Sequence, residues 1–387
     1  MKRLRVLHII PTMNSGGGAE AVLERLIGAN RANVHAVVTL LETGPLGERL
    51  VADGTSVETL GLRGPADLPR ALWRLRTLLR AARPDVVQTW MYHADLLGGV
   101  LARLCGIRCV VWGLHHTTFE RGGSSRSSRL GARLCALLSG QVPRRVVSCS
   151  EAGIAPHVAL GYRADRLVVV HNGYDDRVFS PALPGVNRMR EERGIAAEVR
   201  LIGMAARWDP QKDHGTLLRA LRELARRACS NGTTAHDWHC LLFGTRIDAD
   251  NAALCALIES CGLSDRVTLL GSRRDVVDVM RSLDVAVLSS RFGEAFPNVL
   301  NESMLVGVPC VTTAVGDAAM IVGDTGWVVP PADPVALAAA LAQALDALQV
   351  PADWQRRQHA CRERIATHFS VSRMRDGYDA VWREALG

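Results

Sequence analysis

The stretch VRLIGMAARWDPQKDHGTLLRALRELARRA, residues 199–228, decides the fold. Its first part, Arg200–Met204, is a short apolar run with the length and composition of a buried strand. Its last part, Gly215–Arg226, has apolar residues at helical spacing with arginines between them, so it predicts an amphipathic helix. A strand, a polar loop and a helix in this order form one unit of a parallel α/β sheet.

The same alternation runs along nearly the whole chain. Strand-like runs precede residue 195 at Arg5–Ile10, His35–Leu41, Val86–Thr89, Cys109–Trp112, Arg145–Ser148 and Leu167–His171, and follow it at Arg200–Met204, Trp238–Phe243, Arg266–Leu270, Val285–Ser289 and Val308–Thr312. Two such series predict an α/β protein with two Rossmann-like, doubly wound domains. The segment Asn172–Arg193 is the expected linker, and Asp353–Leu386 is expected to form helices with a break near His368–Val371. Because ligands bind at the carboxyl ends of parallel strands, we expect the site in the cleft between the domains.

Length and composition agree with two globular domains. The chain has 387 residues, 48% apolar and 22% charged, which excludes collagen-like and disordered classes. No uncharged apolar run reaches the ~18–20 residues of a membrane span, and the run Val6–Ile10 is too short for a signal peptide. The ten cysteines show neither CxxC pairs nor zinc-like spacing. These features predict a cytoplasmic protein without a metal site.

Positive charge is concentrated in the first half of the chain. Residues 1–180 carry 23 Lys and Arg against 14 Asp and Glu, a net charge of +9, and residues 181–387 carry 23 against 25, a net charge of −2. The segment Arg121–Arg145 has six arginines and no acidic residue. Its helical part places leucines along one stripe and arginines near another: Leu130, Leu134, Leu137 and Leu138, and Arg126, Arg129 and Arg133. The segment is either an ordinary solvated helix or a surface that faces a membrane or an acceptor. Without interleaved aromatic residues, nucleic acid is not the expected partner.

A glycine cluster follows the first predicted strand. Gly16, Gly17 and Gly18 lie in a loop that leads into an amphipathic helix, where exposed backbone N–H groups favour an anion. Read as Gly16-x-Gly18-x-x-Ala21, the loop also matches the dinucleotide fingerprint of an NAD-dependent oxidoreductase, with Glu42 at the expected distance. The residues between the strand and Gly16 argue against this alternative, because the dinucleotide turn follows its strand almost at once.

Arg207 and Lys212 lie between the predicted strand and helix of residues 199–228. Of the 46 basic residues only Lys2 and Lys212 are lysines, which favours a role that needs a compact, mobile charge, such as binding phosphate. Cations at a helix N-terminus oppose the helix dipole, so we expect an anion between these two.

Two glutamates bracket the start of another predicted helix. In SSRFGEAFPNVLNESMLVG, residues 289–307, Glu294 lies in the loop after a strand and Pro297 stands where a helix begins. The N–H groups of Asn298 and Val299 are placed to hold a phosphate, and Glu302 is placed to accept two hydroxyls such as those of a ribose.

Together these motifs resemble those of the family-4 glycosyltransferases, which have the GT-B fold of two Rossmann-like domains. The resemblance rests on segments that occur in family order: GGGAE at 16–20, Ser150-Glu151, HNGYD at 171–175, Arg207 with Lys212, Gly244, EAFPNVLNE at 294–302, VGVPCVTTAVGDAAMIVGDTGWVVPPADPVALAAAL at 306–341, and the terminal helix. It implies an acceptor-binding domain at 1–175, a nucleotide-sugar-binding domain at 176–370 and a C-terminal helix at 371–387 that packs on the first domain.

The resemblance also implies roles for single residues. Arg207 and Lys212 would neutralise the donor diphosphate, Glu294 would contact the transferred sugar, and Glu302 would bind the ribose. Further donor contacts are expected at Gly16, Gly17, Gly18, Gly244, Arg273, Phe296, Asn298 and Val299. The active-site histidine corresponds to His115 or His116, with His115 preferred for its distance from the preceding strand, and His93 and His116 are expected near the acceptor.

The implied reaction moves a sugar from a nucleotide-diphosphate donor, UDP rather than GDP, with retention of configuration and without metal or cofactor. The acceptor would be a glycan or a polyprenyl-diphosphate-linked sugar of cell-surface polysaccharide assembly, and the basic first half fits such an acceptor at the inner face of the membrane. The alternatives are a nucleotide-sugar 2-epimerase of the same fold, the oxidoreductase and a non-catalytic sugar-nucleotide-binding protein. Asp248-Ala-Asp250 matches the Asp-x-Asp pattern of metal-dependent transferases, but it lies in a loop that leads into a helix.

Overall fold

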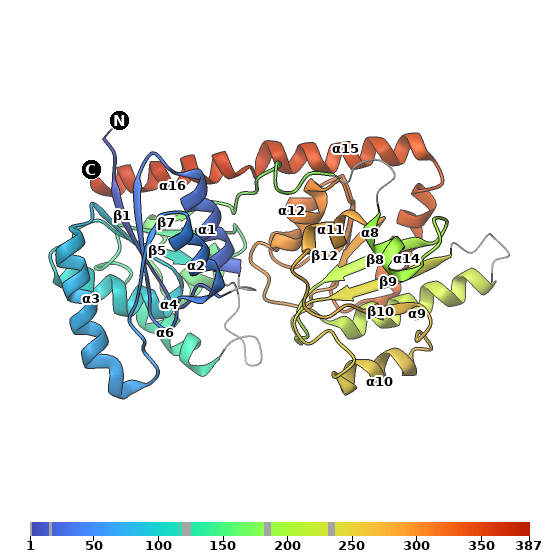
Figure 1. Ribbon diagram of the computed structural model, residues 1–387, viewed down its shortest axis with the longest axis horizontal. Helices are drawn as coiled ribbons and strands as arrows, with labels where there is room; N and C mark the ends of the chain where they lie inside the picture. Colours follow the sequence, from blue (N-terminus) through green and yellow to red (C-terminus); the bar gives the residue numbers. More distant parts are fainter. Residues whose placement is uncertain (1, 15–17, 116, 118–124, 182–186, 231–236) are drawn as a thin grey trace. The chain divides into compact units, whose positions relative to one another are not determined.

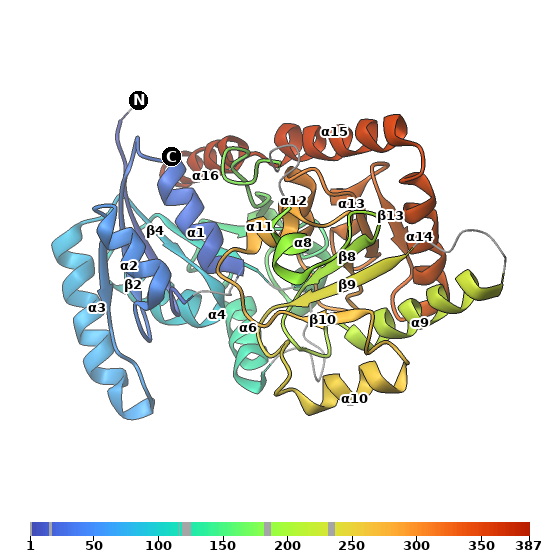
Figure 2. The same cartoon turned by 45° about the vertical axis from the view of Figure 1, so that its right-hand side comes forward.

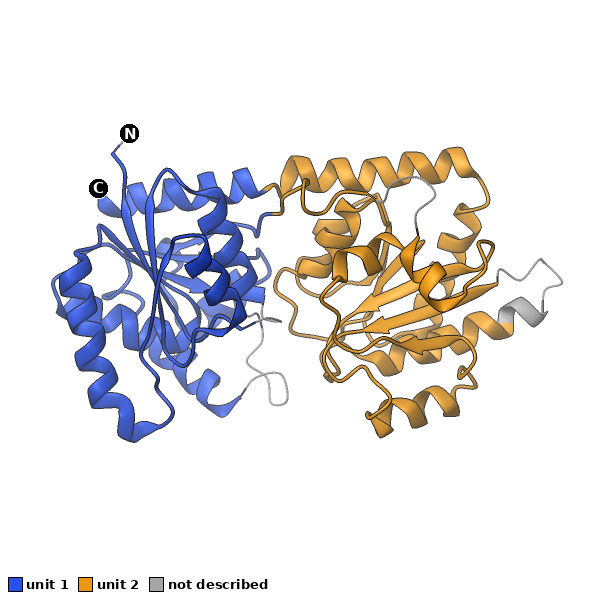
Figure 3. Cartoon of the chain, viewed as in Figure 1, with its two compact units in different colours: residues 1–173, 371–387 blue, residues 174–370 orange. Residues whose placement is uncertain are grey.

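Two parallel β-sheets, each covered by helices, carry the two units of the chain (Figures 1 and 3). The computed structural model describes residues 2–14, 18–115, 117, 125–181, 187–230 and 237–387. Unit 1 comprises residues 1–173 and 371–387, and unit 2 comprises residues 174–370. The boundary expected after residue 175 lies close to the observed one, and the C-terminal helix belongs to unit 1.

Unit 1 has a seven-stranded sheet of parallel neighbours in the order β3-β2-β1-β4-β5-β6-β7. Its strands are β1 (Arg5–Ile10), β2 (Val34–Thr39), β3 (Ser56–Thr59), β4 (Val86–Thr89), β5 (Val110–Leu114), β6 (Arg145–Ser148) and β7 (Leu167–Val169). Its helices are α1 (Gly18–Ala29), α2 (Gly44–Ala52), α3 (Leu68–Ala82), α4 (Met91–Ala94), α5 (Val100–Leu104), α6 (Arg126–Leu138), α7 (Ile154–Leu160) and α16 (Val371–Leu386), with the 3₁₀ turns η1 (Pro65–Asp67) and η3 (Ala164–Arg166) and the π-helix η2 (Asp95–Gly99). The strand order is the doubly wound arrangement that the alternating pattern predicts.

Apolar side chains cover both faces of this sheet, as a buried parallel sheet requires. Residues of β1 alternate between the faces: Val6 and Ile10 pack with α1, α2 and α16, whereas Leu7 and Ile9 pack with α3, α5 and α6. Helices α1 and α3 therefore lie on opposite faces of the sheet (Figure 2).

Helix α16 completes the core of unit 1. Trp382 is fully buried, and its indole N–H donates a hydrogen bond to Oε1 of Gln88 on β4 at 3.0 Å. Oδ1 of Asp379 accepts hydrogen bonds from Nδ2 of Asn30 and of Asn33, both at 2.8 Å. Because buried polar groups need partners, these bonds allow α16 only one position along the sheet.

Unit 2 has a six-stranded parallel sheet in the order β10-β9-β8-β11-β12-β13. Its strands are β8 (Arg200–Ala205), β9 (Trp238–Phe243), β10 (Val267–Leu269), β11 (Val285–Leu288), β12 (Cys310–Thr313) and β13 (Trp327–Val329). Its helices are α8 (Arg188–Arg193), α9 (His214–Ser230), α10 (Ala252–Ser260), α11 (Val276–Arg281), α12 (Asn298–Leu305), α13 (Ala318–Val322), α14 (Pro334–Ala347) and α15 (Pro351–His368). The break between α15 and α16 confirms the one expected near His368–Val371.

The end of the expected linker Asn172–Arg193 is helical. Residues 188–193 form helix α8 of unit 2. Oδ1 of Asn187 caps this helix by accepting a hydrogen bond from the N–H of Arg190 at 3.2 Å, and Met189 is buried. The polar cap, the buried Met189 and the ion pairs of Arg188 with Asp278 and of Arg190 with Asp284 hold this short helix on unit 2.

No single helix in the described part of the chain is both long and apolar enough to span a membrane. Helices α14 and α15 together meet the length and composition for a broken span, and they are bent by 116° at the break between them.

Candidate active site

The loops that follow four neighbouring strands of unit 2 carry the candidate site. Strands β9, β8, β11 and β12 are adjacent and parallel, so their carboxyl ends lie along one edge of the sheet. The loop after β8 carries Arg207 and Lys212, the loop after β9 begins at Gly244, and the loop after β11 carries Glu294. The fold therefore brings together residues that are far apart in the sequence.

Gly244 holds the loop after β9 against the loop after β8. Its φ angle is +141°, and an added Cβ would lie 2.3 Å from the carbonyl oxygen of Ala206. The N–H of Ala206 donates to the carbonyl of Phe243, and that of Trp208 donates to the carbonyl of Thr245, both at 2.9 Å. Only glycine permits this close approach, which places the backbone on both sides of Arg207.

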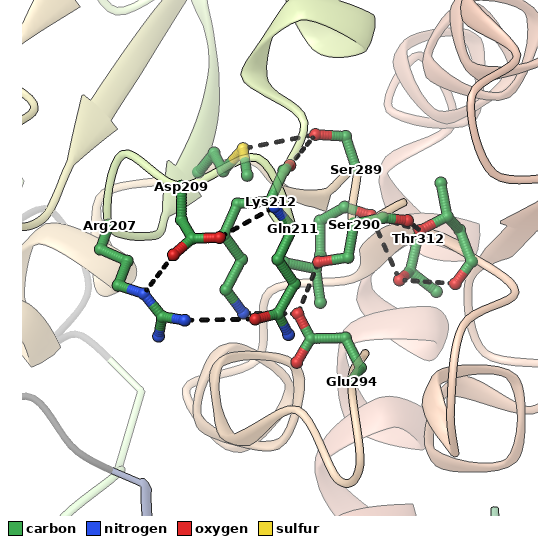
Figure 4. Close-up of polar contacts among 11 residues, drawn as sticks. Arg207, Asp209, Gln211, Lys212, Ser289, Ser290, Glu294 and Thr312 are labelled. Atoms are coloured by element: carbon green, nitrogen blue, oxygen red, sulfur yellow. Dashed lines mark hydrogen bonds and ion pairs between the residues drawn. The ribbon is translucent and has the colours of Figure 1, made fainter. Parts of the chain in front are cut away.

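Asp209 and Gln211 orient the guanidinium of Arg207 (Figure 4). Nε of Arg207 donates to Oδ2 of Asp209, and Nη2 donates to Oε1 of Gln211, both at 3.2 Å. Oδ1 of Asp209 also accepts a hydrogen bond from the N–H of Gln211 at 2.9 Å. The side chain of Arg207 is 52% exposed, so this positioned cation is open to an anion from solvent.

Lys212 and Glu294 form an ion pair that is mostly shielded from solvent. Nζ of Lys212 donates to Oε1 of Glu294 at 2.5 Å, and the two side chains are 14% and 8% exposed. The hydroxyl of Ser290 donates to the same carboxylate oxygen at 2.6 Å, and the carbonyl of Ser290 accepts a hydrogen bond from Thr313 at 2.6 Å. Figure 4 shows Lys212 and Ser290 directed at Glu294 from different loops. A ligand here would meet the ammonium group of Lys212 next to the carboxylate of Glu294, which can accept hydrogen bonds from hydroxyl groups.

The turn that leads from Lys212 into α9 is tightly held. Asp213 has a φ angle of +45°, which is uncommon for a residue other than glycine. Its carboxylate accepts hydrogen bonds from the N–H of Thr216 at 3.0 Å and from the Thr216 hydroxyl at 2.7 Å, which caps α9. Oγ of Ser289 lies 2.9 Å from the carbonyl oxygen of Lys212 and 3.1 Å from that of Asp213, so its hydroxyl donates to this turn.

His214, the first residue of α9, is buried beside Lys212. Its side chain is 2% exposed, its ring centroid lies 5.2 Å from that of Trp208, and neither ring nitrogen has a hydrogen-bond partner among the described residues. Burial, with a smaller contribution from the charge of Lys212, lowers the pKa of His214 to about 4. The ring is therefore neutral at pH 7 and adds no charge to the site.

Helix α12 starts at Asn298, directly after Pro297 as expected. Asn298, Val299 and Glu302 are half-buried in its first two turns, and Oδ1 of Asn298 accepts a hydrogen bond from the Tyr174 hydroxyl. The first turn therefore places the N–H groups of the helix start at the same edge of the sheet as Glu294.

Phe296 lies in the interior rather than at the surface. Its side chain is 5% exposed and packs edge-to-face on Phe369 with centroids 5.2 Å apart. In the loop opposite, Gly316 has a φ angle of +59°, and an added Cβ would lie 2.2 Å from the carbonyl oxygen of Glu294. These contacts hold the backbone from 294 to 297, so any donor contact of Phe296 would come through its backbone.

Arg273 is already bound to two carboxylates. It donates to both oxygens of Asp275 at 2.8 and 2.7 Å and to both oxygens of Glu192 at 3.3 and 3.2 Å. These bonds raise the pKa of Arg273 above its ordinary value. Its contact with the donor stays a prediction, in which the guanidinium would have to share or exchange these partners.

The site residues expected in unit 1 are described in part. Gly18 is the exposed first residue of α1, and His93 is exposed on α4. His115 follows β5, is half-buried and stacks on Trp90 with ring centroids 5.2 Å apart. Gly16, Gly17 and His116 lie outside the described residues.

Four polar residues that hold the charged groups were missed by the sequence analysis. Asp209 and Gln211 orient Arg207, Ser289 holds the turn after Lys212, and Ser290 binds Glu294. In the sequence, only their positions mark them: Asp209 and Gln211 lie between the two cations, and Ser289 and Ser290 follow a strand. Because such residues are common in loops, position does not distinguish them.

Two family models match the chain, one in each half. The model described as Glycosyltransferase Family 4 matches residues 16–178, and the model described as Glycosyl transferases group 1 matches residues 199–347. The chain is a family-4, group 1 glycosyltransferase.

Curated relatives and a solved structure agree with this family. The glycosyltransferase is 27% identical to the lipopolysaccharide core biosynthesis mannosyltransferase LpcC of Rhizobium leguminosarum bv. viciae, over 86% of this chain and 89% of LpcC. It is 23% identical to the UDP-Gal:alpha-D-GlcNAc-diphosphoundecaprenol alpha-1,3-galactosyltransferase of Escherichia coli, over 63% of this chain and 61% of that enzyme. The structure of HepE from Anabaena, in complex with UDP and glucose, superposes with a TM-score of 0.82 and 20% identity, over 99% of this chain and 100% of HepE. The likeness to HepE confirms the predicted GT-B fold.

Proposed function

We propose that this glycosyltransferase moves a hexose or N-acetylhexosamine from a UDP-sugar to a glycan or polyprenyl-diphosphate-linked acceptor in the assembly of cell-surface polysaccharide. The observation that carries the proposal is the set of charges in unit 2. Arg207 is positioned but open, and Lys212 is paired with Glu294 at the edge of the sheet where α12 starts. Two cations suit a diphosphate, and two carboxylates, Glu294 and Glu302, suit the hydroxyls of a sugar and a ribose.

The main task of such an enzyme is to stabilise the leaving group. When the bond between the anomeric carbon and the diphosphate oxygen breaks, negative charge grows on the diphosphate and positive charge on the sugar ring. Arg207, Lys212 and the N–H groups at the start of α12 are the groups we assign to the diphosphate. On this assignment charge stabilisation comes from the protein itself, and the reaction proceeds without a metal or cofactor.

We propose that the configuration at the anomeric carbon is retained. Glu294 is bound by Lys212 and Ser290, so its carboxylate is held in place. A fixed carboxylate suits accepting hydrogen bonds from sugar hydroxyls better than acting as a mobile nucleophile. The acceptor oxygen would form its bond to the anomeric carbon on the face from which the diphosphate leaves. Its proton would pass to the departing phosphate oxygen. His115, and His93 with His116, are the candidates for contacts to the sugar and the acceptor.

The relatives support the chemical class of donor and acceptor. The HepE structure holds UDP and glucose, and the E. coli relative is a galactosyltransferase that uses a UDP-sugar and a diphosphoundecaprenol-linked acceptor. LpcC belongs to lipopolysaccharide core biosynthesis. We therefore propose action in the cytoplasm at the inner face of the cell membrane, where such an acceptor is anchored.

A thermal-shift screen tests the donor site. UDP, GDP, ADP, CMP, dTDP and NAD are each added with and without EDTA. A ligand at 100 times its dissociation constant stabilises the folded state by ~2.7 kcal/mol. We expect UDP to raise the melting temperature, EDTA to leave that rise unchanged and Glu302→Ala to abolish it.

The matched control is Glu259→Ala, which removes an exposed glutamate from α10 of the same unit and should keep the UDP shift. A shift with NAD alone would overturn the proposal, and so would a UDP shift that disappears with EDTA. With UDP-sugar and acceptor together, NMR of the product reports whether the anomeric configuration is retained. Conversion of the UDP-sugar to its 2-epimer without acceptor would instead identify an isomerase.

A further inference from the structure

Helix α6 of unit 1 turns three of its four leucines outward. The fourth, Leu138, was expected in the same stripe but is half-buried and packs on the core. The residues that face the sheet are small, namely Gly131, Ala132, Cys135 and Ala136, and all are buried. Leu130, Leu134 and Leu137 are 59%, 42% and 77% exposed. At positions i, i+4 and i+7 these three leucines form one line along the helix.

The small residues explain why the leucines are left outside. An added Cβ on Gly131 would lie 3.3 Å from Cβ of Tyr92 on α4, and Sγ of Cys135 donates to the carbonyl of Tyr92 at 3.6 Å. Helix α6 is also capped at both ends. Oγ of Ser125 accepts a hydrogen bond from the N–H of Ser128 at 3.1 Å, and the hydroxyl of Ser139 donates to the carbonyl of Ala136 at 2.8 Å. The leucines therefore do not hold α6 in place, although keeping them in water has a cost.

Positive charge accompanies the leucines on the same side of the helix. Arg126 and Arg133 are exposed, Arg129 is half-buried, and none of the three has an ion-pair partner in the part of the chain that the structure describes. The helices that pack on α6 offer no exposed carboxylate: α4 and α7 contain no acidic residue, and Asp95 of η2 is fully buried. We define the outer face of α6 as Arg126, Arg129, Leu130, Arg133, Leu134 and Leu137 (α6 is labelled in Figure 1).

We propose that the outer face of α6 docks on an anionic lipid bilayer. A helix that lies in a membrane surface has a line of large apolar side chains beside a row of cations, with little overall hydrophobicity. The leucines would enter the acyl boundary, and the arginines would extend their alkyl stems along it to reach lipid phosphates. An uncharged partner would leave the three arginines without counter-charges, and a second copy of this chain would bring arginines against arginines. The inference rests on the proposed function in one respect, since it gives the proposed membrane contact a defined surface.

Vesicle co-sedimentation tests the docking surface. The full chain is mixed, without donor, with vesicles of phosphatidylcholine alone or of phosphatidylcholine and phosphatidylglycerol. We expect binding to the phosphatidylglycerol vesicles and little binding to phosphatidylcholine alone. Each arginine near an anionic surface contributes about fivefold to partitioning, so Arg126→Gln/Arg129→Gln/Arg133→Gln should weaken binding on the order of 100-fold. Leu130→Ser/Leu134→Ser/Leu137→Ser should abolish detectable binding.

Helices α3 and α5 of the same unit supply the matched controls. Arg70, Arg76 and Arg80 are exposed on it, so Arg70→Gln/Arg76→Gln/Arg80→Gln changes the net charge equally elsewhere. Trp73→Ser/Leu104→Ser removes two side chains that are 68% and 79% exposed. Both control variants should bind vesicles like the wild type. All variants should melt near the wild-type temperature, because every changed side chain except the half-buried Arg129 is exposed.

Three results would overturn the proposal. In the first, the wild-type protein does not sediment with phosphatidylglycerol vesicles. In the second, the α6 variants bind these vesicles like the wild type. In the third, the wild type binds no lipid but forms a dimer that the leucine variant converts to a monomer. The nucleotide screen contains no lipid and the vesicle assay contains no donor. The failure of one proposal is therefore distinguishable from the failure of the other.

Discussion

Nζ of Lys212 lies 2.5 Å from Oε1 of Glu294, although the two residues are 82 positions apart in the chain. They come from the loops after β8 and β11, which are hydrogen-bonded neighbours in the sheet. A single ion pair thus joins the loop that carries the cations to the loop that leads into α12. A ligand that displaces one of these loops is therefore expected to displace the other through this ion pair.

Replacing Lys212 by glutamine should reduce transfer activity strongly. Loss of one group that stabilises developing charge typically costs 10²–10³-fold in kcat. The substitution also leaves the carboxylate of Glu294, 8% exposed, without its cation. We therefore expect a lower melting temperature as well, and steady-state kinetics with a thermal melt will measure both effects.

Lys2→Gln is the natural control for this experiment. Lys2 is the other lysine of the chain, its side chain is 76% exposed, and its ion pair with Asp85 at 3.1 Å lies at the surface of unit 1. Exposed pairs contribute little, so activity and melting temperature should stay at wild-type values. Equal activity of the two variants would contradict the role assigned to Lys212.

Gly244→Ala should displace the backbone around Arg207. The new Cβ would meet the carbonyl oxygen of Ala206 at 2.3 Å, and the φ angle of +141° is unfavourable for alanine. Gly262→Ala is the control, since Gly262 also has a positive φ of +67° but has no atom within 4 Å of an added Cβ. We expect both variants to lose about 1 kcal/mol or more from backbone strain, and only Gly244→Ala to lose the UDP-dependent thermal shift.

The stability of unit 2 should fall as the pH falls below the ordinary pKa of histidine. In the folded chain the pKa of His214 is about 4, and its ordinary value is 6.5. Between these values the unfolded chain binds a proton that the folded chain does not, so the free energy of unfolding is highest above pH 6.5 and decreases toward pH 4. At pH 5 the loss from this one residue is about 2 kcal/mol.

Urea unfolding of the wild type and of His214→Gln at pH 7.5 and pH 5 measures this loss. Burial also lowers the pKa of His8 and His35 in unit 1, and these residues remain in the variant. Their contribution therefore cancels in the comparison. We expect a smaller decrease for His214→Gln, and an identical decrease in both proteins would contradict the buried, neutral state of His214.

Trp382→Ala should destabilise unit 1 selectively. Trp382 is fully buried and hydrogen-bonded to Gln88, so truncation leaves a cavity and an amide without its partner. Such a change typically costs about 3–5 kcal/mol. Hydrogen exchange should accelerate in β1 and β4 but not in β8 and β11, because the latter strands belong to unit 2. Trp73→Ala, which removes a side chain that is 68% exposed, should change neither the stability of unit 1 nor its hydrogen exchange.

Central strands were predictable because they are buried on both faces. The runs Arg5–Ile10, Val86–Thr89 and Trp238–Phe243 have the expected bounds. The strands that were not expected, β3 and β13, lie at sheet edges. β3 reads SVET and has no fully buried residue, and β13 has only three residues, so neither has an apolar run long enough to detect.

Other features depend on contacts between distant residues. The π-helix η2 places Gly98 and Gly99 so close to Ile9 and Trp112 that an added Cβ would lie 2.7 and 2.4 Å away, and no local pattern reports such packing. The orientation of α6 was also open, since its leucine stripe and its stripe of small residues are both apolar. Only the space beside Tyr92 selects the small residues for the interior.

The charged residues of the candidate site were predictable, but their partners were not. Arg207, Lys212 and Glu294 stand in segments with a recognisable order along the chain. Lys212 binds Glu294 because strands β8 and β11 are neighbours in the sheet. The sequence alone predicted only that Lys212 would bind an anion. The occupation of Arg273 by Asp275 and Glu192 follows from loop geometry in the same way.

The position of α16 in the chain bears on how the protein is made. Every strand and helix of unit 2 lies between Tyr174 and Ser370, whereas unit 1 needs Met374, Tyr378, Val381 and Trp382 from the end of the chain to close its core. A ribosome therefore delivers a complete unit 2 while unit 1, although synthesised first, still has one open apolar face. We therefore expect unit 2 to complete its core before unit 1, and the nascent chain to carry that open face until α16 emerges.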